Sequence, residues 1–251
     1  MTGYSISRYK EFPKIVGGID ENSTQKAFEV YSKVCSKVSK VSSAKAAELI
    51  KVAEGLYRDV NIALANEIYK ICQSWGLNFW EIRKHANHKF CAIHEPGSVG
   101  GHCIPVYPWF IINQEDVKTP LLQLARKIND EMVDYYISKI EEITPAPARI
   151  AIVGLSYREG VKEKAYARSI PLINSLSSKG YTVYGYDQLY SNEEIKEQFS
   201  AIPIEMKELK KLDCIIIFNE LPNEANELKE IKEKVIDVKN SFHKEKHTWY
   251  R

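Results

Sequence analysis

The 251-residue sequence has no long hydrophobic run. No stretch of about 18 apolar residues occurs, so no membrane span is expected. Residues 1–14 are polar and lack the apolar core of a signal peptide. The formal net charge is only +2, which gives no electrostatic reason to expect a nucleic-acid partner. These absences predict a globular protein of the cytoplasm that binds neither a membrane nor nucleic acid.

Cysteine is scarce, and its five copies are widely spaced. Their number is odd and no C-x-x-C pair occurs, which argues against a zinc knuckle or a dithiol redox motif. We therefore expect no metal site. Reduced thiols of a cytosolic protein fit this pattern best.

Two glycine-rich patterns that bind nucleotide phosphates are also missing. Neither G-x-G-x-x-G nor G-x-x-x-x-G-K-[ST] occurs anywhere in the sequence. Both patterns bring the backbone close to phosphate oxygens at the start of a helix. Without them, we expect the chain itself to bind no dinucleotide cofactor.

What the sequence does contain is a dense loop at residues 96–108, which reads PGSVGGHCIPVYP. Its three glycines and three prolines forbid a regular helix or a central strand. A thiol, Cys103, directly follows Gly100, Gly101 and His102. Taken alone, the loop fits a tight turn around a buried, inert cysteine slightly better than a catalytic element, because free cysteine is among the most buried residue types.

Helices are predicted over residues 44–75 and 119–143, before a stiff proline-containing linker at 144–147. The residues expected to face inward on the second helix are Leu121, Leu124, Ala125, Ile128, Met132, Tyr135, Tyr136 and Ile140. The first has an apolar face and a polar stripe, and the stripe consists of Lys51, Glu54, Arg58 and Asn61. Such a stripe is usually a solvated face with ion pairs. A helix about 45 Å long is not covered by so small a domain. We therefore expect it to pack against other helices, including a second copy of itself.

From residue 149 onward, apolar strands alternate with helices, and one of these helices is expected at about 223–234. This pattern predicts a doubly wound parallel sheet that binds ligands at the carboxyl ends of its strands. The residues expected at that edge are Gly154–Gly160, Asp187, Asn219 and Asp237. Without a dinucleotide fingerprint, we interpret Asp187 as a turn residue. The basic residues of the first turn are Arg158, Lys162, Lys164 and Arg168. They fit either a solvated loop or a site for a nucleotide diphosphate.

Together these residues make the chain resemble the UDP-glucose/GDP-mannose dehydrogenase family, which consists of nucleotide-sugar 6-dehydrogenases. The nearest branch is that of the UDP-N-acetyl-D-mannosamine dehydrogenases. The resemblance depends most on R-D-V-N-I-A at residues 58–63 and G-G-H-C-I at 100–104. Further matches are V-G-G-I-D at 16–20, N-E at 66–67 and G-L-S-Y at 154–157. Almost the whole chain from about Lys14 is covered.

The resemblance implies an α/β protein in which an all-helical domain precedes a Rossmann-like one. The expected parts are the end of an N-terminal domain at 1–41, a central dimerisation domain with the cysteine loop at 42–118, a connecting helix and linker at 119–147, and a nucleotide-sugar-binding domain at 148–251. Family members begin with an NAD-binding domain that we expect to be missing here or to lie on a separate subunit. The expected partners are a UDP-sugar and a second copy of the chain, paired through the long helix.

The resemblance also implies a reaction, the two-step oxidation of a sugar C6 alcohol to a carboxylate with two NAD. Cys103 matches the nucleophile, which adds to the intermediate aldehyde as a thiohemiacetal and then carries the thioester. Lys51 matches a lysine that stabilises the oxyanion, and we expect it to face Cys103 across one pocket. The residues expected to bind substrate are Arg58, Asn61, Lys89, Gly100, Gly101, His102, Tyr157, Arg158 and Arg168.

Two positions depart from the family. Gly55 stands where the family has an asparagine, and Tyr107 where it has an aspartate, so two groups that position the oxyanion and the hydrolytic water are absent. One hypothesis is therefore the substrate half of a dehydrogenase, inactive without an NAD-binding domain. The alternatives are a non-catalytic module for nucleotide-sugar binding or dimerisation, and a scaffold without a ligand.

Overall fold

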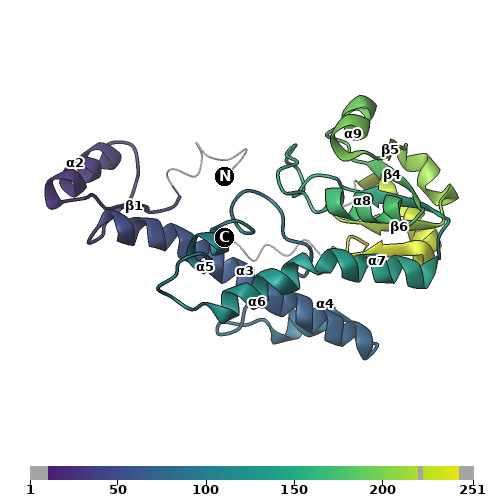
Figure 1. Ribbon diagram of the computed structural model, residues 1–251, viewed down its shortest axis with the longest axis horizontal. Coiled ribbons are helices and arrows are strands. Elements are labelled where there is room, and N and C mark those ends of the chain that lie inside the picture. The colour runs from purple at the N-terminus through teal and green to yellow at the C-terminus, as the bar shows by residue number, and fades with distance from the viewer. Residues whose placement is uncertain (1–10, 220–222, 243–251) are drawn as a thin grey trace. The chain divides into compact units, whose positions relative to one another are not determined.

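A computed structural model describes residues 11–219 and 223–242 (Figure 1). The chain divides after Tyr57 into two compact units. The first unit carries a strand, a helix, a second strand and the beginning of a long helix. These elements are β1 (Lys14–Val16), α2 (Glu21–Ser32), β2 (Val38–Lys40) and α3 (Ala44–Ser74).

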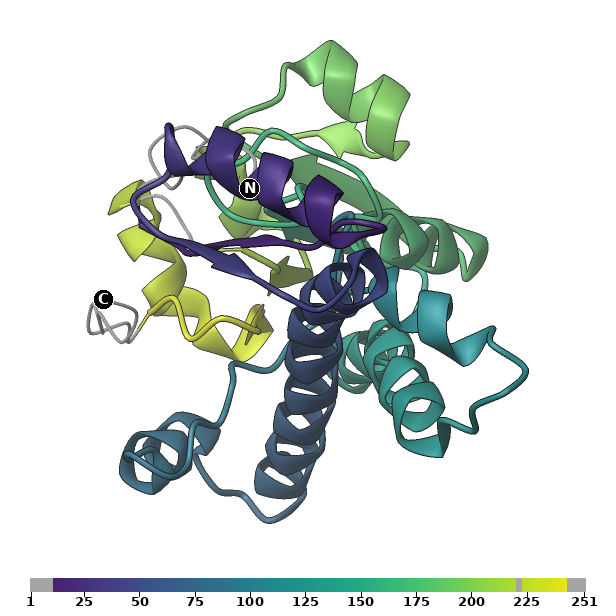
Figure 2. The ribbon, with the colours of Figure 1, turned by 90° about the vertical axis from the view of Figure 1, so that its left-hand side faces the viewer.

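The strands of the first unit pair in parallel, and α2 lies alongside them (Figure 2). Asp20 caps α2 as the sequence indicates, because its carboxylate accepts the backbone N–H of Ser23 at 2.6 Å. Ser43 accepts the N–H of Ala46 at 3.1 Å where α3 begins. Local capping signals thus explain where both helices start.

The second unit contains the rest of α3 and the helices that follow it. These are α4 (Phe79–Ala86), α5 (Tyr107–Ile112), α6 (Pro120–Asp130) and α7 (Met132–Ile143). Residues 119–143, predicted as one helix, therefore form two, separated by a single residue. The physical reason is that the two helices pack against different parts of the protein. α6 turns Arg126 and Asn129 toward buried polar partners, whereas α7 packs into the hydrophobic core of the sheet.

The predicted inward face of α6 is partly wrong. Leu121 and Leu124, expected inside, are exposed, and Arg126 and Asn129 are buried. The predicted inward residues that are buried are Ala125, Met132, Tyr136 and Ile140. Hydrophobic periodicity located the helical region correctly. It did not predict which face of α6 is buried, because Arg126 and Asn129 form hydrogen bonds inside the protein.

Among the described residues, five parallel strands form a sheet in the second unit. Its elements are β3 (Arg149–Val153), α8 (Ser169–Ser178), β4 (Thr182–Tyr186), α9 (Asn192–Phe199), β5 (Ile202–Pro203), the 3-10 helix η1 (Met206–Lys211), β6 (Cys214–Ile217), the 3-10 helix η2 (Asn223–Lys234) and β7 (Val235–Asp237). The strand order is β5-β4-β3-β6-β7, so the winding reverses between β3 and β6. The predicted doubly wound α/β fold is confirmed. Residues 223–234 were expected to be α-helical, and nothing in their composition explains the 3-10 form.

Apolar side chains fill both faces of the sheet. On one face, where Figure 1 shows α7 and α8, the helices α7, α8 and α9 cover residues such as Ile150 and Ile216. On the other face, η1 and η2 cover Ala151, Val153 and Ile215. Burial on both sides accounts for the continuously apolar sequences of β3 and β6. Within the described part of the chain, no helix is long and apolar enough to span a membrane.

Candidate functional site: a pocket at the edge of the sheet

The carboxyl ends of β3, β4 and β6 meet at the edge expected to bind ligands. After β3 the chain turns at Gly154, whose φ is 84°, and a Cβ there would lie 2.5 Å from the Cβ of Asn219. Asp187, after β4, accepts the backbone N–H groups of Leu155 and Ser156 at 2.8 and 3.1 Å. Asp187 is therefore a structural turn residue, as predicted.

The acid after β4 is engaged by its own turn. Asp187 stands where an acid would hold a ribose, but its Oδ2 receives two backbone N–H groups and its Oδ1 receives that of Leu189 at 3.0 Å. The turn from Gly154 to Gly160 also lacks the glycine pattern for a pyrophosphate. Likewise, no group of three His, Cys, Asp or Glu side chains in the described ranges is placed to hold a metal ion.

The glycine-rich loop packs against the turn between β3 and α8. Gly101 has a φ of 89°, and a Cβ there would lie 2.7 Å from the Tyr157 ring. The N–H of Gly101 donates to the carbonyl of Ala165 at 3.1 Å. A Cβ on Gly100 would lie 2.7 Å from the carbonyl oxygen of Tyr166. Only glycine fits at both positions, because the backbone of the cysteine loop lies directly against this turn.

His102 adds a second link between the same loops. Its Nε2 lies 3.4 Å from Oε2 of Glu163, and its ring meets that of Tyr166 edge-on at 6.4 Å between centroids. The backbone N–H of Ala165 and the His102 side chain lower the pKa of Glu163, so this carboxylate stays ionised at neutral pH. The pair is partly exposed, which limits what it adds to stability.

A small pocket, partly open to solvent, lies where these loops meet the sheet edge. Its lining includes three of the predicted substrate residues, Gly100, Tyr157 and Arg168. Four buried polar atoms of the lining residues have no hydrogen-bond partner among the described residues, namely Ser98 Oγ, Tyr136 OH, Ser156 Oγ and Arg168 Nε. Leaving buried donors unpaired is costly. The lining therefore suits a ligand that is rich in acceptor oxygens.

Charge and protonation in the pocket favour an anion. Burial raises the pKa of Tyr136 well above its usual range, so its hydroxyl keeps its proton and can donate it in a hydrogen bond. Arg168 and Lys239 both belong to the lining and are cationic at neutral pH. Phosphate oxygens match this combination of neutral and charged donors.

The other basic residues of the turn are placed elsewhere. Arg158 lines a neighbouring depression at the same edge, and its guanidinium lies 5.9 Å from the ring centroid of Tyr157. Lys162 pairs with Glu194 at 2.6 Å. Of the basic residues in this turn, Arg168 is thus the one that lines the pocket with Gly100.

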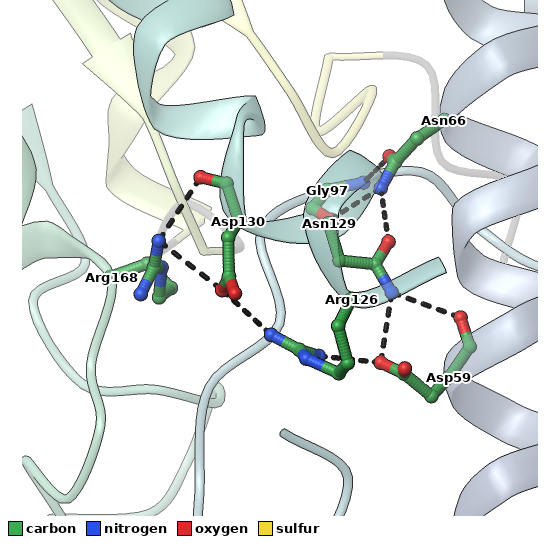
Figure 3. Close-up of polar contacts among 7 residues, drawn as sticks. All are labelled: Asp59, Asn66, Gly97, Arg126, Asn129, Asp130 and Arg168. Atoms are coloured by element: carbon green, nitrogen blue, oxygen red, sulfur yellow. Dashed lines mark hydrogen bonds and ion pairs between the residues drawn. The ribbon is translucent and has the colours of Figure 1, made fainter. Parts of the chain in front are cut away.

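A polar network lies behind the pocket (Figure 3). Arg126 on α6 donates from Nη1 to Asp59 Oδ1 on α3 at 2.5 Å, and from Nη2 to Asp130 Oδ1 at 2.6 Å. Arg168 donates from Nη2 to the backbone carbonyl of Asp130 at 3.0 Å and lies 3.5 Å from Asp130 Oδ1. Burial raises the pKa of the Asp59 carboxyl, and the Arg126 guanidinium opposes that rise. Charges therefore alternate from α3 to the pocket.

The same network holds the start of the glycine-rich loop. Asn129 donates to Asp59 Oδ1 at 2.8 Å and accepts a hydrogen bond from Asn66 at 2.9 Å. Asn66 accepts the backbone N–H of Gly97 at 2.7 Å and donates to its carbonyl at 3.1 Å. All three of these polar side chains are fully buried. The position of Gly97 is therefore fixed relative to α3 and α6.

Cys103 is exposed, whereas Cys91 is half-buried and the other three cysteines are buried. The carbonyl of Cys103 accepts the N–H groups of Val106 and Tyr107 at 3.2 and 2.9 Å, in the turn that leads into α5. The interpretation of the loop alone, a buried thiol, is thus wrong. The loop's own contacts are made through its glycines, which leaves the thiol accessible.

Lys51 lies in the first unit and Cys103 in the second, so their approach across one pocket stays a prediction. Lys51 is exposed and pairs with Glu54 at 2.8 Å, one turn further along α3. This is the ion pair that an ordinary solvated helix face shows.

Three other predicted substrate residues do not line the pocket. Lys89 is exposed, with its ammonium 5.5 Å from the ring centroid of Phe90. Arg58 is exposed on α3, and burial together with the charge of Arg58 lowers the pKa of His94. Asn61 is half-buried on the same helix. Their assignment to the substrate stays a prediction.

Sequence reasoning missed the network residues and part of the pocket lining. A signal for the network was present, because Arg126 and Asn129 stand at inward helical spacing on α6, and Asp59 and Asn66 stand seven residues apart on α3. Polar residues at core spacing on two helices indicate that the helices meet through them. No such signal marks the lining residues Ser98, Tyr136 and Lys239, which come from separate segments.

Comparison with known proteins agrees with this architecture. Residues 45–131 match the sequence model of the UDP-glucose/GDP-mannose dehydrogenase family, central domain, and residues 151–244 match that family's UDP binding domain. The chain is 33% identical over 98% of its length to the UDP-N-acetyl-D-mannosamine dehydrogenase of Methanocaldococcus jannaschii, covering 59% of that protein. It is 33% identical over 70% of its length to the NDP-N-acetyl-D-galactosaminuronic acid dehydrogenase of Ralstonia solanacearum, covering 43% of it.

Solved structures show the same relationship. The UDP-N-acetyl-mannosamine dehydrogenase of Staphylococcus aureus superposes with a TM-score of 0.79 at 27% identity, over 96% of this chain and 59% of the other. The UDP-D-ManNAc dehydrogenase of Pyrococcus horikoshii gives 0.77 at 26% identity, over 94% of this chain and 56% of the other.

The chain is an α/β protein in which a helical region precedes a doubly wound sheet. A pocket lies at the edge of this sheet. The chain belongs to the UDP-glucose/GDP-mannose dehydrogenase family and comprises its central and UDP-binding domains. It spans little more than half the length of the Methanocaldococcus jannaschii relative.

We predict that Arg126→Met lowers the free energy of unfolding by about 3–5 kcal/mol, because it leaves the Asp59 carboxylate buried without its cation. Lys127→Met is the matched control. Lys127 is adjacent in sequence, but its ion pair with Glu131 is exposed, so the expected change is under about 1 kcal/mol. Urea denaturation of both variants measures the difference, and equal losses would contradict a structural role for the buried pair.

Proposed function

We propose that this chain is the substrate-binding and thiol-bearing part of an NAD-dependent nucleotide-sugar 6-dehydrogenase, with the pocket as the site for the UDP group of its substrate. One observation supports this most directly. Ser98, Tyr136 and Arg168, each with a buried polar atom that has no partner among the described residues, line a pocket whose wall includes Gly100 of the loop that carries Cys103. A diphosphate supplies the acceptor oxygens that those donors lack.

In this proposal, the two ends of the substrate occupy separate places. The diphosphate occupies the pocket beside Arg168, and the backbone at Gly100 leaves room for a close approach by the sugar. The sugar then extends along the loop toward Cys103, two residues beyond Gly101. The Methanocaldococcus jannaschii relative is a UDP-N-acetyl-D-mannosamine dehydrogenase, and we propose a UDP-sugar of this kind as the ligand.

Cys103 is proposed as the nucleophile of the second oxidation. Its exposed thiol, once ionised, adds to the carbonyl carbon of the sugar aldehyde and forms a thiohemiacetal. In a continuous helix α3, Lys51 and Arg58 are two turns apart and so share a face. We propose that Lys51 stabilises the oxyanion of this adduct, and that Arg58 and Asn61 contact the sugar.

We propose that this part of the protein does not provide the hydride acceptor. Because Asp187 already accepts three backbone N–H groups of its own turn, we propose that NAD is held by another domain or subunit and that the chain alone does not turn over. A cytoplasmic location fits such a cofactor-dependent enzyme.

One observation favours the alternative, a module that binds nucleotide sugars without catalysis. The ring of Tyr107 stacks on that of Phe110 at 5.8 Å between centroids, where the family resemblance leads one to expect a carboxylate. A phenol that packs in this way does not replace a carboxylate that orients a water molecule.

We also propose that the chain forms a homodimer through α3. Four apolar residues on this helix recur every seven positions and are 38 to 58% exposed, namely Ile50, Tyr57, Leu64 and Ile71. A seven-residue apolar repeat forms one continuous stripe, which is the pattern by which helices pair with one another. A second copy of α3 would remove this stripe from water.

Isothermal titration calorimetry tests the proposed pocket directly. We predict that the chain binds UDP and that Arg168→Ala weakens binding by about tenfold or more, because a charged hydrogen bond to phosphate is lost. Arg149→Ala is the control. Arg149 begins β3 and so lies at the opposite edge of the same sheet, and its removal leaves the affinity unchanged. Absence of any UDP binding by the unaltered chain would overturn the proposal.

Alkylation by iodoacetamide separates the catalytic hypothesis from the binding module. Cys103 is predicted to be the fastest of the five thiols to react in the folded chain, so Cys103→Ser removes the fast phase while Cys91→Ser, at a half-buried position, does not. UDP-N-acetyl-mannosamine slows this phase, and UDP alone slows it less because it lacks the sugar. If the bound nucleotide sugar does not change the rate, Cys103 is not beside the reacting carbon.

Sedimentation velocity tests the dimer. We predict that Leu64→Glu converts a dimer to monomers, because it places a charge in the centre of the apolar stripe. Gln73→Glu is the control, since Gln73 is exposed nine residues further along α3 and therefore on the opposite side of the helix. A monomeric unaltered chain at micromolar concentration would refute pairing through α3.

A further inference from the structure

We infer that Asp130 is a positioning residue for Arg168, and that it controls nucleotide affinity without touching the ligand. The inference rests on the proposed role of the pocket. Asp130 is the last residue of α6, whereas Arg168 immediately precedes α8. The two residues are thus brought together by the fold and not by the sequence.

Asp130 holds Arg168 at one end of its guanidinium. Nη2 donates to the Asp130 carbonyl at 3.0 Å and lies 3.5 Å from the Asp130 carboxylate, as Figure 3 shows. The guanidinium is planar and rigid, so fixing Nη2 also fixes the direction of its other donors. One of these, Nε, is buried without a partner, and Arg168 lines the pocket. Asp130 therefore sets where a ligand meets Arg168.

Arg126 allows Asp130 to orient Arg168 without cancelling its charge. The Asp130 carboxylate lies 2.6 Å from Arg126 Nη2, much closer than its 3.5 Å separation from Arg168. Coulombic attraction falls with distance, so Asp130 attracts Arg126 more strongly than Arg168 and its negative charge is shared between the two guanidiniums. Arg168 therefore keeps part of its positive charge for an anion. Arg126 is in turn anchored to Asp59 in the core.

The contact between Asp130 and Arg168 is more exposed than the ion pair between Asp59 and Arg126, which stabilises the fold. The side chains of Asp59 and Arg126 are 0 and 3% exposed, whereas those of Asp130 and Arg168 are 42 and 25% exposed. Ion pairs at such partly exposed positions add little to folding stability. They can still increase affinity, because a donor that is already oriented loses less freedom when the ligand binds.

A double-mutant cycle measured by UDP calorimetry tests the inference. We expect Arg168→Ala to raise the Kd about tenfold or more. Asp130→Ala keeps the backbone carbonyl but removes the carboxylate that lies 3.5 Å from Arg168, and we expect it to raise the Kd about fivefold. Because Asp130 acts through Arg168, the double variant should bind no more weakly than Arg168→Ala. Asp130→Asn, which keeps an acceptor oxygen, should retain more affinity than Asp130→Ala. Asp134→Ala, which removes an exposed acid from the first turn of α7, should leave the Kd unchanged.

The outcomes distinguish this inference from the proposed function. If Asp130→Ala loses the same factor in the Arg168→Ala background, its effect is structural and the inference is wrong. An unchanged Kd for Asp130→Ala or for Arg168→Ala, in a chain that binds UDP, also overturns the inference but leaves the nucleotide site intact. If the unaltered chain does not bind UDP, the proposed function and the inference fail together.

Discussion

The buried ion pair between Asp59 and Arg126 is the constraint on which the rest of the second unit depends. Both side chains are almost completely removed from water, and each would be strongly destabilising without the other. The pair therefore fixes how α3 and α6 meet. Asn129 adds hydrogen bonds to the same carboxylate and the same backbone, so the contact has a defined geometry and not only an opposite charge.

Both walls of the pocket depend on that contact. Through Asn129 and Asn66 it reaches the backbone of Gly97, where the glycine-rich loop begins. Through Asp130 it reaches Arg168, in the turn that precedes α8. The loop and the turn also touch each other where Gly101 meets Tyr157. One polar network thus places a thiol-bearing loop and a cationic turn, which lie more than 50 residues apart in the sequence, beside one pocket.

The sheet has the strand order of a dinucleotide-binding domain, yet its acid after β4 is used differently. The Asp187 carboxylate accepts the backbone N–H groups of Leu155, Ser156 and Leu189, and so stabilises its own turn beside the pocket. In the proposed function, nucleotide binding and reaction at the sugar both belong to this part of the chain, and the hydride acceptor comes from another part.

The sequence by itself determined the local structure and the family. Helix starts at Asp20 and Asn78, the strand–helix alternation after residue 149, and the motifs around Arg58 and Cys103 depend on neighbours a few positions apart. Their physical causes are capping and periodicity, which are local. The tertiary structure decided the exposure of Cys103 and which face of α6 is buried. It also decided which basic residue of the turn lines the pocket, namely Arg168. Each of these follows from partners more than 30 residues away, because burial and charge pairing depend on which distant groups the fold brings together.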